Sequence, residues 1–220
     1  MYRRGLLLAT AGAAAAPGAL AQQQVTVALG RAQPGQLPAG FYMALTGKGP
    51  PPMWSVVDDP SASTGRVLAQ TSADKTDYRF PLAIYQPITA ENLEVKVRLK
   101  IMSAGSSLTA GFAVSLRNPN SYYAISANAF EQRVDLLLFA DGKPARVESA
   151  EAEAMPDRWH TLGVMLNDDH FKVYFEGKVL FTAFERTRMK NGRIALRTQE
   201  DTVTRFDRID VRVFPPTEWR

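Results

Sequence analysis

Alternating apolar and polar residues mark short β-strands along most of this chain. Between Leu93 and Ile101 every odd position is apolar and every even position is charged. Residues 159–184 repeat the alternation in three pieces, separated by polar turns at Asn167–His170 and Glu176–Lys178. Because side chains alternate across a strand, each piece has one apolar face to bury and one polar face for solvent. The pattern predicts a meander of antiparallel strands.

Further short strands are predicted throughout residues 54–213, about a dozen in all, with hairpin signals such as Asp141–Gly142 between them. In the last strand Phe206 is out of phase with Ile209, which predicts a β-bulge at Asp207–Arg208. No helix longer than a turn or two is predicted in this range, and parallel strands need crossover helices. The fold class is therefore predicted to be all-β, an antiparallel two-sheet sandwich.

The first 21 residues have the pattern of a secretory signal peptide. Arg3-Arg4 precedes an apolar, alanine-rich run, and Ala19-Leu20-Ala21 is a small-x-small cleavage site. A membrane anchor is the alternative, but Pro17 and Gly18 interrupt the run before the roughly 20 residues that a spanning helix needs. The arginine pair leaves twin-arginine export open beside the general secretory route. We expect a periplasmic or secreted protein with no membrane span after cleavage.

The composition of the mature chain excludes some classes of partner and site. Loss of the signal with its two arginines lowers the formal net charge from +4 to +2, and the remaining basic residues alternate with acidic ones. This balance argues against a nucleic-acid partner. The chain has no cysteine, which excludes disulfides, thiolate nucleophiles and thiolate zinc sites.

The division of the chain follows the same signals. Residues 22–53 are rich in Gly, Pro, Gln and Ala, and they predict a flexible lead-in. Residues 54–213 carry the strand pattern and form the predicted domain, which residues 214–220 follow as a C-terminal tail. A single sandwich of this size is large enough to bury its own core.

Several turn and core motifs together resemble a known superfamily. They are Asn120-Ser121-Tyr122-Tyr123, Trp159-His160-Thr161-Leu162, Phe171-Lys172-Val173-Tyr174-Phe175-Glu176-Gly177-Lys178, Gly192-Arg193-Ile194-Ala195-Leu196 and Phe206-Asp207-Arg208-Ile209. The set resembles secreted bacterial proteins of the concanavalin A-like lectin/glucanase superfamily, the laminin-G-like jelly rolls, and among them a group close to the 3-keto-disaccharide hydrolases. The resemblance implies a jelly-roll sandwich. The E-x-D-x-x-E motif of the superfamily's retaining glucanases is absent from this sequence.

The resemblance to lectins places a sugar-binding surface on the concave sheet. Tyr122 and Tyr123 are the predicted stacking residues, since a planar aromatic ring covers the apolar face of a pyranose. The two are adjacent in one strand and point to opposite faces, so only one of them can face a groove. Arg117 and Asn128 are the predicted polar partners for the sugar hydroxyls. The alternative is that the aromatic residues pack in the core.

A structural calcium ion is the second expectation, because related jelly rolls often hold one near the chain ends and the ion prefers oxygen ligands. The candidate ligands are the carboxylates near the first and last strands, Asp58, Asp59, Asp201 and Asp207. The alternative, slightly favoured, is that these residues form turns and ion pairs with Arg205 and Arg208.

The functional hypothesis is an exported, non-catalytic module that binds a carbohydrate or glycan. One alternative is a glycoside hydrolase or lyase for a modified disaccharide, with carboxylates brought together from separate strands. A second alternative is a structural interaction domain of the cell envelope. Facing carboxylates in a cleft would favour the enzyme, and an exposed apolar patch would favour the interaction domain.

Overall fold

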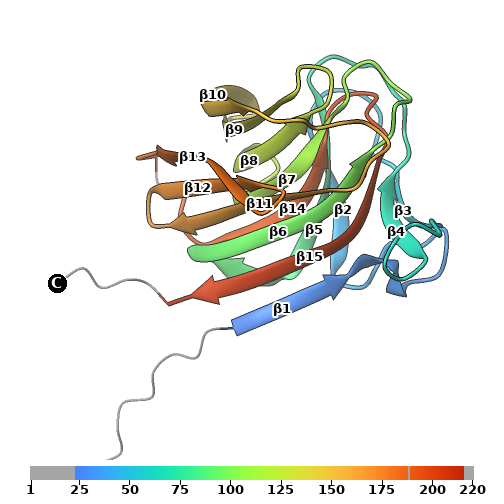
Figure 1. Cartoon of the computed structure of the whole chain (residues 1–220), viewed down its shortest axis with the longest axis horizontal. Helices are drawn as coiled ribbons and strands as arrows, with labels where there is room; N and C mark the ends of the chain where they lie inside the picture. The colour runs from blue at the N-terminus through green and yellow to red at the C-terminus, as the bar shows by residue number, and fades with distance from the viewer. Residues whose placement is uncertain (1–22, 188, 216–220) are drawn as a thin grey trace, which may run out of the picture.

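The computed structural model describes residues 23–187 and 189–215, and the signal peptide predicted for residues 1–21 lies outside them. Two antiparallel sheets pack face to face as a sandwich (Figure 1), which confirms the predicted fold class. Among the described residues, no helix has the length and hydropathy to cross a membrane.

The first sheet has eight strands. In spatial order they are β13 (Lys178–Phe184), β12 (His170–Phe175), β11 (His160–Asn167), β6 (Asn92–Ile101), β15 (Thr204–Phe214), β4 (Arg66–Gln70) and β3 (Trp54–Asp58), with β1 (Gln23–Ala28) beside β15. The second sheet has seven strands. They are β10 (Lys143–Glu151), β9 (Arg133–Ala140), β8 (Ser121–Asn128), β7 (Thr109–Asn118), β14 (Gly192–Thr198), β5 (Arg79–Ala90) and β2 (Phe41–Gly47). A short 3₁₀ helix, η1 (Leu29–Arg31), follows β1.

The main core lies between the sheets and contains the apolar positions of the alternating pattern. In β6, Val95 and Val97 face the same layer as their β11 partners Val164 and Leu162, and all four side chains are fully buried. Residues such as Phe112 of β7 pack against them from the other sheet. This is the packing that two amphipathic sheets require.

The predicted β-bulge in β15 is confirmed. The pairing of β15 with β6 shifts register between Phe206 and Arg208, which leaves Asp207 as the extra residue. Phe206 points into the main core, and the carboxylate of Asp207 is buried against Arg98 and Ser63. A bulge reorients side chains in this way.

The segment expected to be a flexible lead-in instead contributes to both sheets. β1 pairs along β15, and β2 forms the edge of the seven-stranded sheet beside β5. The few apolar residues of this segment are enough to hold it in the fold, because an edge strand needs to bury only one of its faces. In β2, for example, Phe41 is buried. The folded unit therefore begins before residue 54, and at the other end β15 extends to Phe214, the first residue of the predicted tail.

The seven-stranded sheet is strongly curled, so its outer face is concave. Phe80 of β5 and Phe139 of β9 have ring centroids 5.0 Å apart, although three strands lie between β5 and β9. In a flat sheet four strand spacings would separate them by about 19 Å. The hydroxyls of Thr46 in β2 and Tyr122 in β8 lie 3.1 Å apart across a similar span. Apolar side chains therefore form a second buried cluster on this concave face.

Candidate functional site

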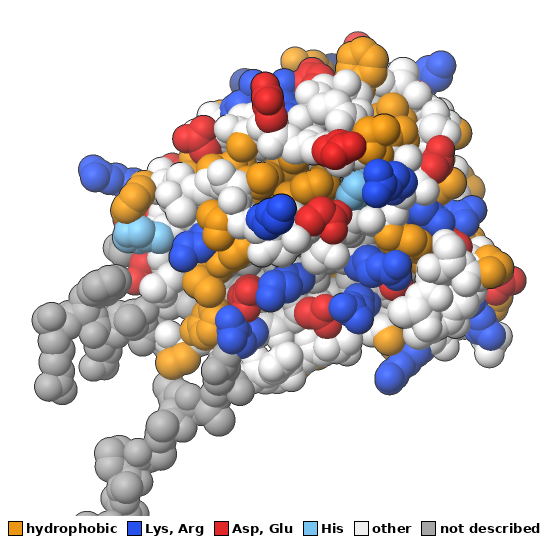
Figure 2. Space-filling view, viewed as in Figure 1, with side chains coloured by type: hydrophobic (Ala, Val, Ile, Leu, Met, Phe, Trp, Pro, Cys, Tyr) orange, Lys and Arg blue, Asp and Glu red, His pale blue; other side chains and the backbone are white. Residues whose placement is uncertain are grey.

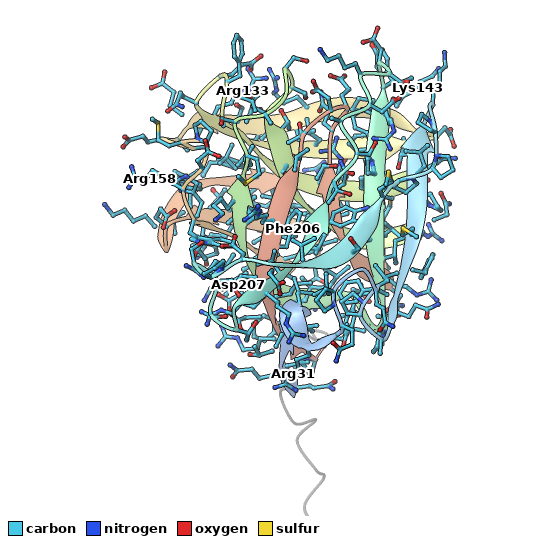
Figure 3. All side chains as sticks on the ribbon, turned by 90° about the vertical axis from the view of Figure 1, so that its right-hand side faces the viewer. Arg31, Arg133, Lys143, Arg158, Phe206 and Asp207 are labelled. Atoms are coloured by element: carbon cyan, nitrogen blue, oxygen red, sulfur yellow. The ribbon has the colours of Figure 1, made fainter. Side chains whose placement is uncertain are left out.

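A cavity of about 470 Å³ opens on the concave face, beside the second apolar cluster. Its floor contains the buried residues Phe80, Thr109, Asp135 and Arg197, and its mouth contains exposed residues that include Tyr78. The floor residues come from β5, β7, β9 and β14, so the curl of the sheet brings them together. Figure 3 shows Arg133, another residue of this cavity, near one end of the molecule, well away from Asp207.

Arg197 is the central residue of the floor. It pairs with Gly111 of β7, which in turn pairs with Ser126 of β8. Because glycine has no side chain, Arg197 reaches over β7, and its Nη1 donates to the Ser126 hydroxyl at 2.9 Å. The guanidinium carbon lies 4.6 Å from the ring centroid of Phe80 and 4.9 Å from that of Phe139. These aromatic contacts stabilise the cation.

The polar contacts of Arg197 are incomplete. Its side chain is 0 % exposed, and Nε and Nη2 have no hydrogen-bond partner among the described residues. Burial lowers the pKa of Arg197, while the Tyr122 hydroxyl and, at longer range, Glu200 oppose this effect. A guanidinium nevertheless stays protonated in proteins. The cavity floor thus contains a buried positive charge with two free donors.

The neighbouring carboxylate of Asp135, in contrast, has two cationic partners. Its Oδ2 accepts from Arg133 Nε at 3.0 Å, and its Oδ1 lies 3.1 Å from Arg146 Nε. Arg133 also pairs with Glu131 at the mouth. The two mouth arginines are therefore neutralised by two carboxylates.

A second acidic group lines the cavity at the turn between β14 and β15. Glu200 has φ of 50°, in the left-handed region, and burial followed by the nearby Asp77 carboxylate raises the pKa of its side chain. Its backbone carbonyl accepts from Arg79 Nη1 at 3.2 Å. Arg79, also 0 % exposed, further donates to the carbonyls of Pro50 and Pro51. Arg79 therefore holds this turn in place.

Of the predicted ligand-binding residues, only Asn128 lines this cavity. Its Oδ1 accepts from the backbone amides of Phe130 and Glu131, which orders the turn at the mouth. Arg117 is exposed near the end of β7 and lies outside the cavity lining.

The prediction that Tyr122 or Tyr123 faces a groove is wrong, because both are buried. Tyr122 points to the concave face but stacks on Phe139, with ring centroids 4.5 Å apart, beneath the curled sheet. Tyr123 points into the main core, where its ring meets Phe171 at 4.8 Å. The two tyrosines do point to opposite faces, but both faces are filled at this position.

The four aspartates proposed as calcium ligands have protein partners instead. Asp58 lies 3.7 Å from Arg66, Asp59 pairs with Lys100 and Arg205, Asp207 accepts from Ser63 and pairs with Arg98, and Asp201 accepts from the amides of Ser106 and Ser107. Within residues 23–187 and 189–215, no three histidine or acidic side chains gather as a metal site would require. The interpretation as turn formers and ion-pair partners fits these contacts, although Arg98 takes the role expected of Arg208.

Known proteins match this protein in structure but not in sequence. No protein-family model matches the sequence, and no curated protein matches it. Many solved structures are similar in fold, and three of them are described here. The carbohydrate-binding module CBM66 from Bacillus subtilis superposes with a TM-score of 0.58 at 14% identity, covering 75% of this chain and 91% of that chain.

The other two are a carbohydrate recognition domain and a glucanase. The domain of Emp47p has a TM-score of 0.56 at 11% identity, covering 87% of this chain and 95% of its own. The Bacillus licheniformis β-glucanase has a TM-score of 0.54 at 10% identity, covering 87% of this chain and 98% of its own. At these identities the likeness concerns the fold, which confirms the jelly-roll sandwich that the sequence motifs implied; none of the comparisons concerns the group close to the 3-keto-disaccharide hydrolases. The protein has the jelly-roll fold of the concanavalin A-like lectins and glucanases.

Proposed function

We propose that this protein is an exported glycan-binding module whose ligand enters the cavity on the concave face. The observation that carries the proposal is a polar cavity of about 470 Å³ with an exposed aromatic ring, Tyr78, at its mouth. This volume lies within the range of small-molecule sites, roughly 300–1,000 Å³. Similar folds in a carbohydrate-binding module and a carbohydrate recognition domain support the proposal.

The chemistry of the lining suits a sugar. Hydroxyl groups both donate and accept hydrogen bonds, and the cavity offers amides at Asn128 and Gln199 beside charged donors and acceptors. Tyr78 is 62% exposed and offers a flat ring for the apolar face of a pyranose. A ligand of this kind would be oriented by a few polar contacts and covered by one aromatic side chain.

The proposal is for binding without catalysis. Asp135 forms ion pairs with both Arg133 and Arg146, which disfavours its use as a base or nucleophile. The glucanase carboxylate motif is also absent from the sequence. Export through a signal peptide at residues 1–21 would place the module where it meets extracellular or periplasmic glycans.

A glycoside hydrolase or lyase is the second candidate. The observation that favours it is the raised pKa of Glu200, a carboxyl that lines the cavity close to Asp77. A carboxyl group with a raised pKa is a candidate general acid. If the protein is an enzyme, Glu200→Gln abolishes release of reducing ends or unsaturated sugars, and if it is a binder, neither variant nor wild type releases them.

The test of the proposed function is a thermal-shift screen of mature protein against neutral and acidic oligosaccharides, followed by calorimetry of any hit. A ligand at a hundred times its Kd adds about 2.7 kcal/mol of stability. We expect Tyr78→Ala to weaken binding about tenfold or more. Phe184→Ala is the matched control, because Phe184 is 64% exposed and lies on β13 away from the cavity. No binding by any oligosaccharide, or equal losses in both variants, would refute the proposal.

A further inference from the structure

The cavity floor holds a cation that the protein itself leaves without an ion-pair partner. Arg197 is 0 % exposed, its hydrogen-bond partners among the described residues are the neutral hydroxyls of Ser126 and Tyr122, and Asp135 and Glu200 act on it only at longer range. A buried charge without a partner costs free energy. Because Arg197 is one of the residues that line the cavity, a ligand that enters it could supply the missing acceptor.

The two free donors define what kind of group fits. Nε and Nη2 form one edge of the planar guanidinium, and their N–H bonds run parallel. Two parallel donors match the two oxygens of a carboxylate in a bidentate pair. Nη1, on the other edge, is already used by Ser126, and Phe80 and Phe139 contact the guanidinium through their rings. The free edge is therefore held in a fixed orientation.

We propose that the cavity binds a saccharide that carries a carboxylate, such as a hexuronic acid, and that Arg197 holds this carboxylate through Nε and Nη2. This inference rests on the proposed glycan-binding function and names the ligand class. Arg197 is the residue that determines specificity, because it is the one cation of the described cavity lining that has no carboxylate partner.

The mouth of the cavity limits the ligand further. Arg133 and Arg146 are paired with Glu131 and Asp135, so they offer no excess positive charge to a polyanion. Acidic groups at the mouth, such as Glu200, instead favour neutral hydroxyls as partners. The arrangement therefore fits one terminal uronate at the floor, with a neutral remainder of the glycan at the mouth.

The test compares matched ligands on the wild-type protein. A uronate-terminated oligosaccharide is titrated beside the same molecule with its carboxylate reduced to a primary alcohol, and beside a sulfate ester of the neutral form. We expect the carboxylate form to bind at least tenfold more tightly than the reduced form, and more tightly than the sulfate ester. This comparison needs no variant, so it does not depend on whether a mutated protein folds.

Two variants then assign the preference to one side chain. In Arg197→Met we expect the Kd values of the carboxylate and alcohol forms to differ by no more than about twofold. Arg197→Lys keeps the charge but loses the two parallel donors, so we expect it to retain only part of the preference for the carboxylate form. Arg117→Met is the matched control, since Arg117 is an exposed arginine of the same sheet outside the cavity, and it should keep the full preference.

The outcomes separate this inference from the proposed function. Equal binding of the carboxylate and alcohol forms, with loss of both in Tyr78→Ala, overturns the role of Arg197 and leaves glycan binding intact. Equal binding of the sulfate ester overturns the assignment to a carboxylate. A preference that survives in folded Arg197→Met overturns the assignment to Arg197. Absence of binding by every saccharide overturns both proposals.

Discussion

The outer faces of the two sheets differ in whether every buried charge described here has a partner of opposite charge. On the eight-stranded sheet the buried carboxylates have cationic partners: Asp59 lies 2.8 Å from Lys100 and 2.9 Å from Arg205, and Asp207 pairs with Arg98. Figure 2 shows positive and negative side chains interspersed across this face. On the concave face of the seven-stranded sheet, Arg197 is buried without a carboxylate partner. The first arrangement stabilises the fold, whereas the second is suited to a ligand.

The two fully buried arginines, Arg79 and Arg197, make the comparison sharper. Arg79 gives three hydrogen bonds to backbone carbonyls of Pro50, Pro51 and Glu200 and lies 3.8 Å from the Asp74 carboxylate. Arg197 instead bonds two neutral hydroxyls, those of Ser126 and Tyr122, and its Nε and Nη2 have no hydrogen-bond partner among the described residues. The two arginines are therefore equally buried but differ in their hydrogen-bond partners, as the proposed binding role of Arg197 requires.

The largest expected effect comes from exchanging each arginine for methionine. Arg79→Met leaves three carbonyls without their donor and should lower the free energy of unfolding by roughly 4 kcal/mol. Arg197→Met removes a buried charge that lacks a counterion, so stability should change by less than about 1 kcal/mol or increase. Urea denaturation of both variants and the wild type measures the difference. Equal destabilisation by the two substitutions would contradict the difference in structural role between Arg79 and Arg197.

A smaller effect should follow from Asp59→Asn, which breaks the paired network. Burial alone would raise the pKa of Asp59, but hydrogen bonds from Lys100, Ser61 and Arg205 outweigh it and hold the pKa well below its usual range. The stability from this carboxylate is therefore present above its unfolded pKa of about 3.9 and is lost as pH falls below that value.

At pH 7 we expect Asp59→Asn to lower the free energy of unfolding by roughly 3 kcal/mol, because Lys100 and Arg205 lose their counterion. Between about pH 5 and pH 3 the wild type should lose more stability than the variant. Denaturation curves at a series of pH values test this, and parallel pH profiles of the two proteins would contradict it.

The smallest effect is expected at the mouth of the cavity. Burial, followed by Asp77, raises the pKa of Glu200, so the ionised form is disfavoured in the folded protein. A raised carboxyl pKa means that protonation favours folding as pH falls through the folded pKa. Glu200→Gln should therefore stabilise the protein at pH 7 by less than about 1 kcal/mol, since solvent screens this group, and by almost nothing below about pH 4. A variant less stable at pH 7 would contradict the assignment.

Much of the fold was predictable because alternation reports directly which side of a strand is buried. Residues 93–101 are the clearest case, and the phase change after Phe206 was sufficient to locate a bulge. The strands β1 and β2 were missed because their neighbours are rich in glycine and proline, and an edge strand needs few apolar residues. Curvature was not predictable, since alternation says which residues share a face and not how far that face bends.

The site depends on that curvature, and this explains why its residues were mostly missed. Asn128 was predicted as a polar partner of an outward-facing tyrosine, and it lines the cavity although neither tyrosine does. Either Tyr122 or Tyr123 was expected to face a groove, but the bent sheet places Phe139 and Thr46 against Tyr122 on the concave face. Arg197 alternates with apolar residues as a solvated strand residue does, and only the three-dimensional contacts reveal that it is buried.

Gly111, the partner of Arg197 on β7, limits which residues of the cavity can be substituted. A Cβ at position 111 would lie 1.9 Å from the carbonyl oxygen of Ile125, so any side chain there would push β7 away from β8. The position of Arg197 at the floor therefore depends on the pairing of the strands, whereas Tyr78 and Glu131 at the mouth lie in turns outside the strands. Substitutions at the mouth should therefore be tolerated by the sheet, whereas a substitution at Gly111 should not.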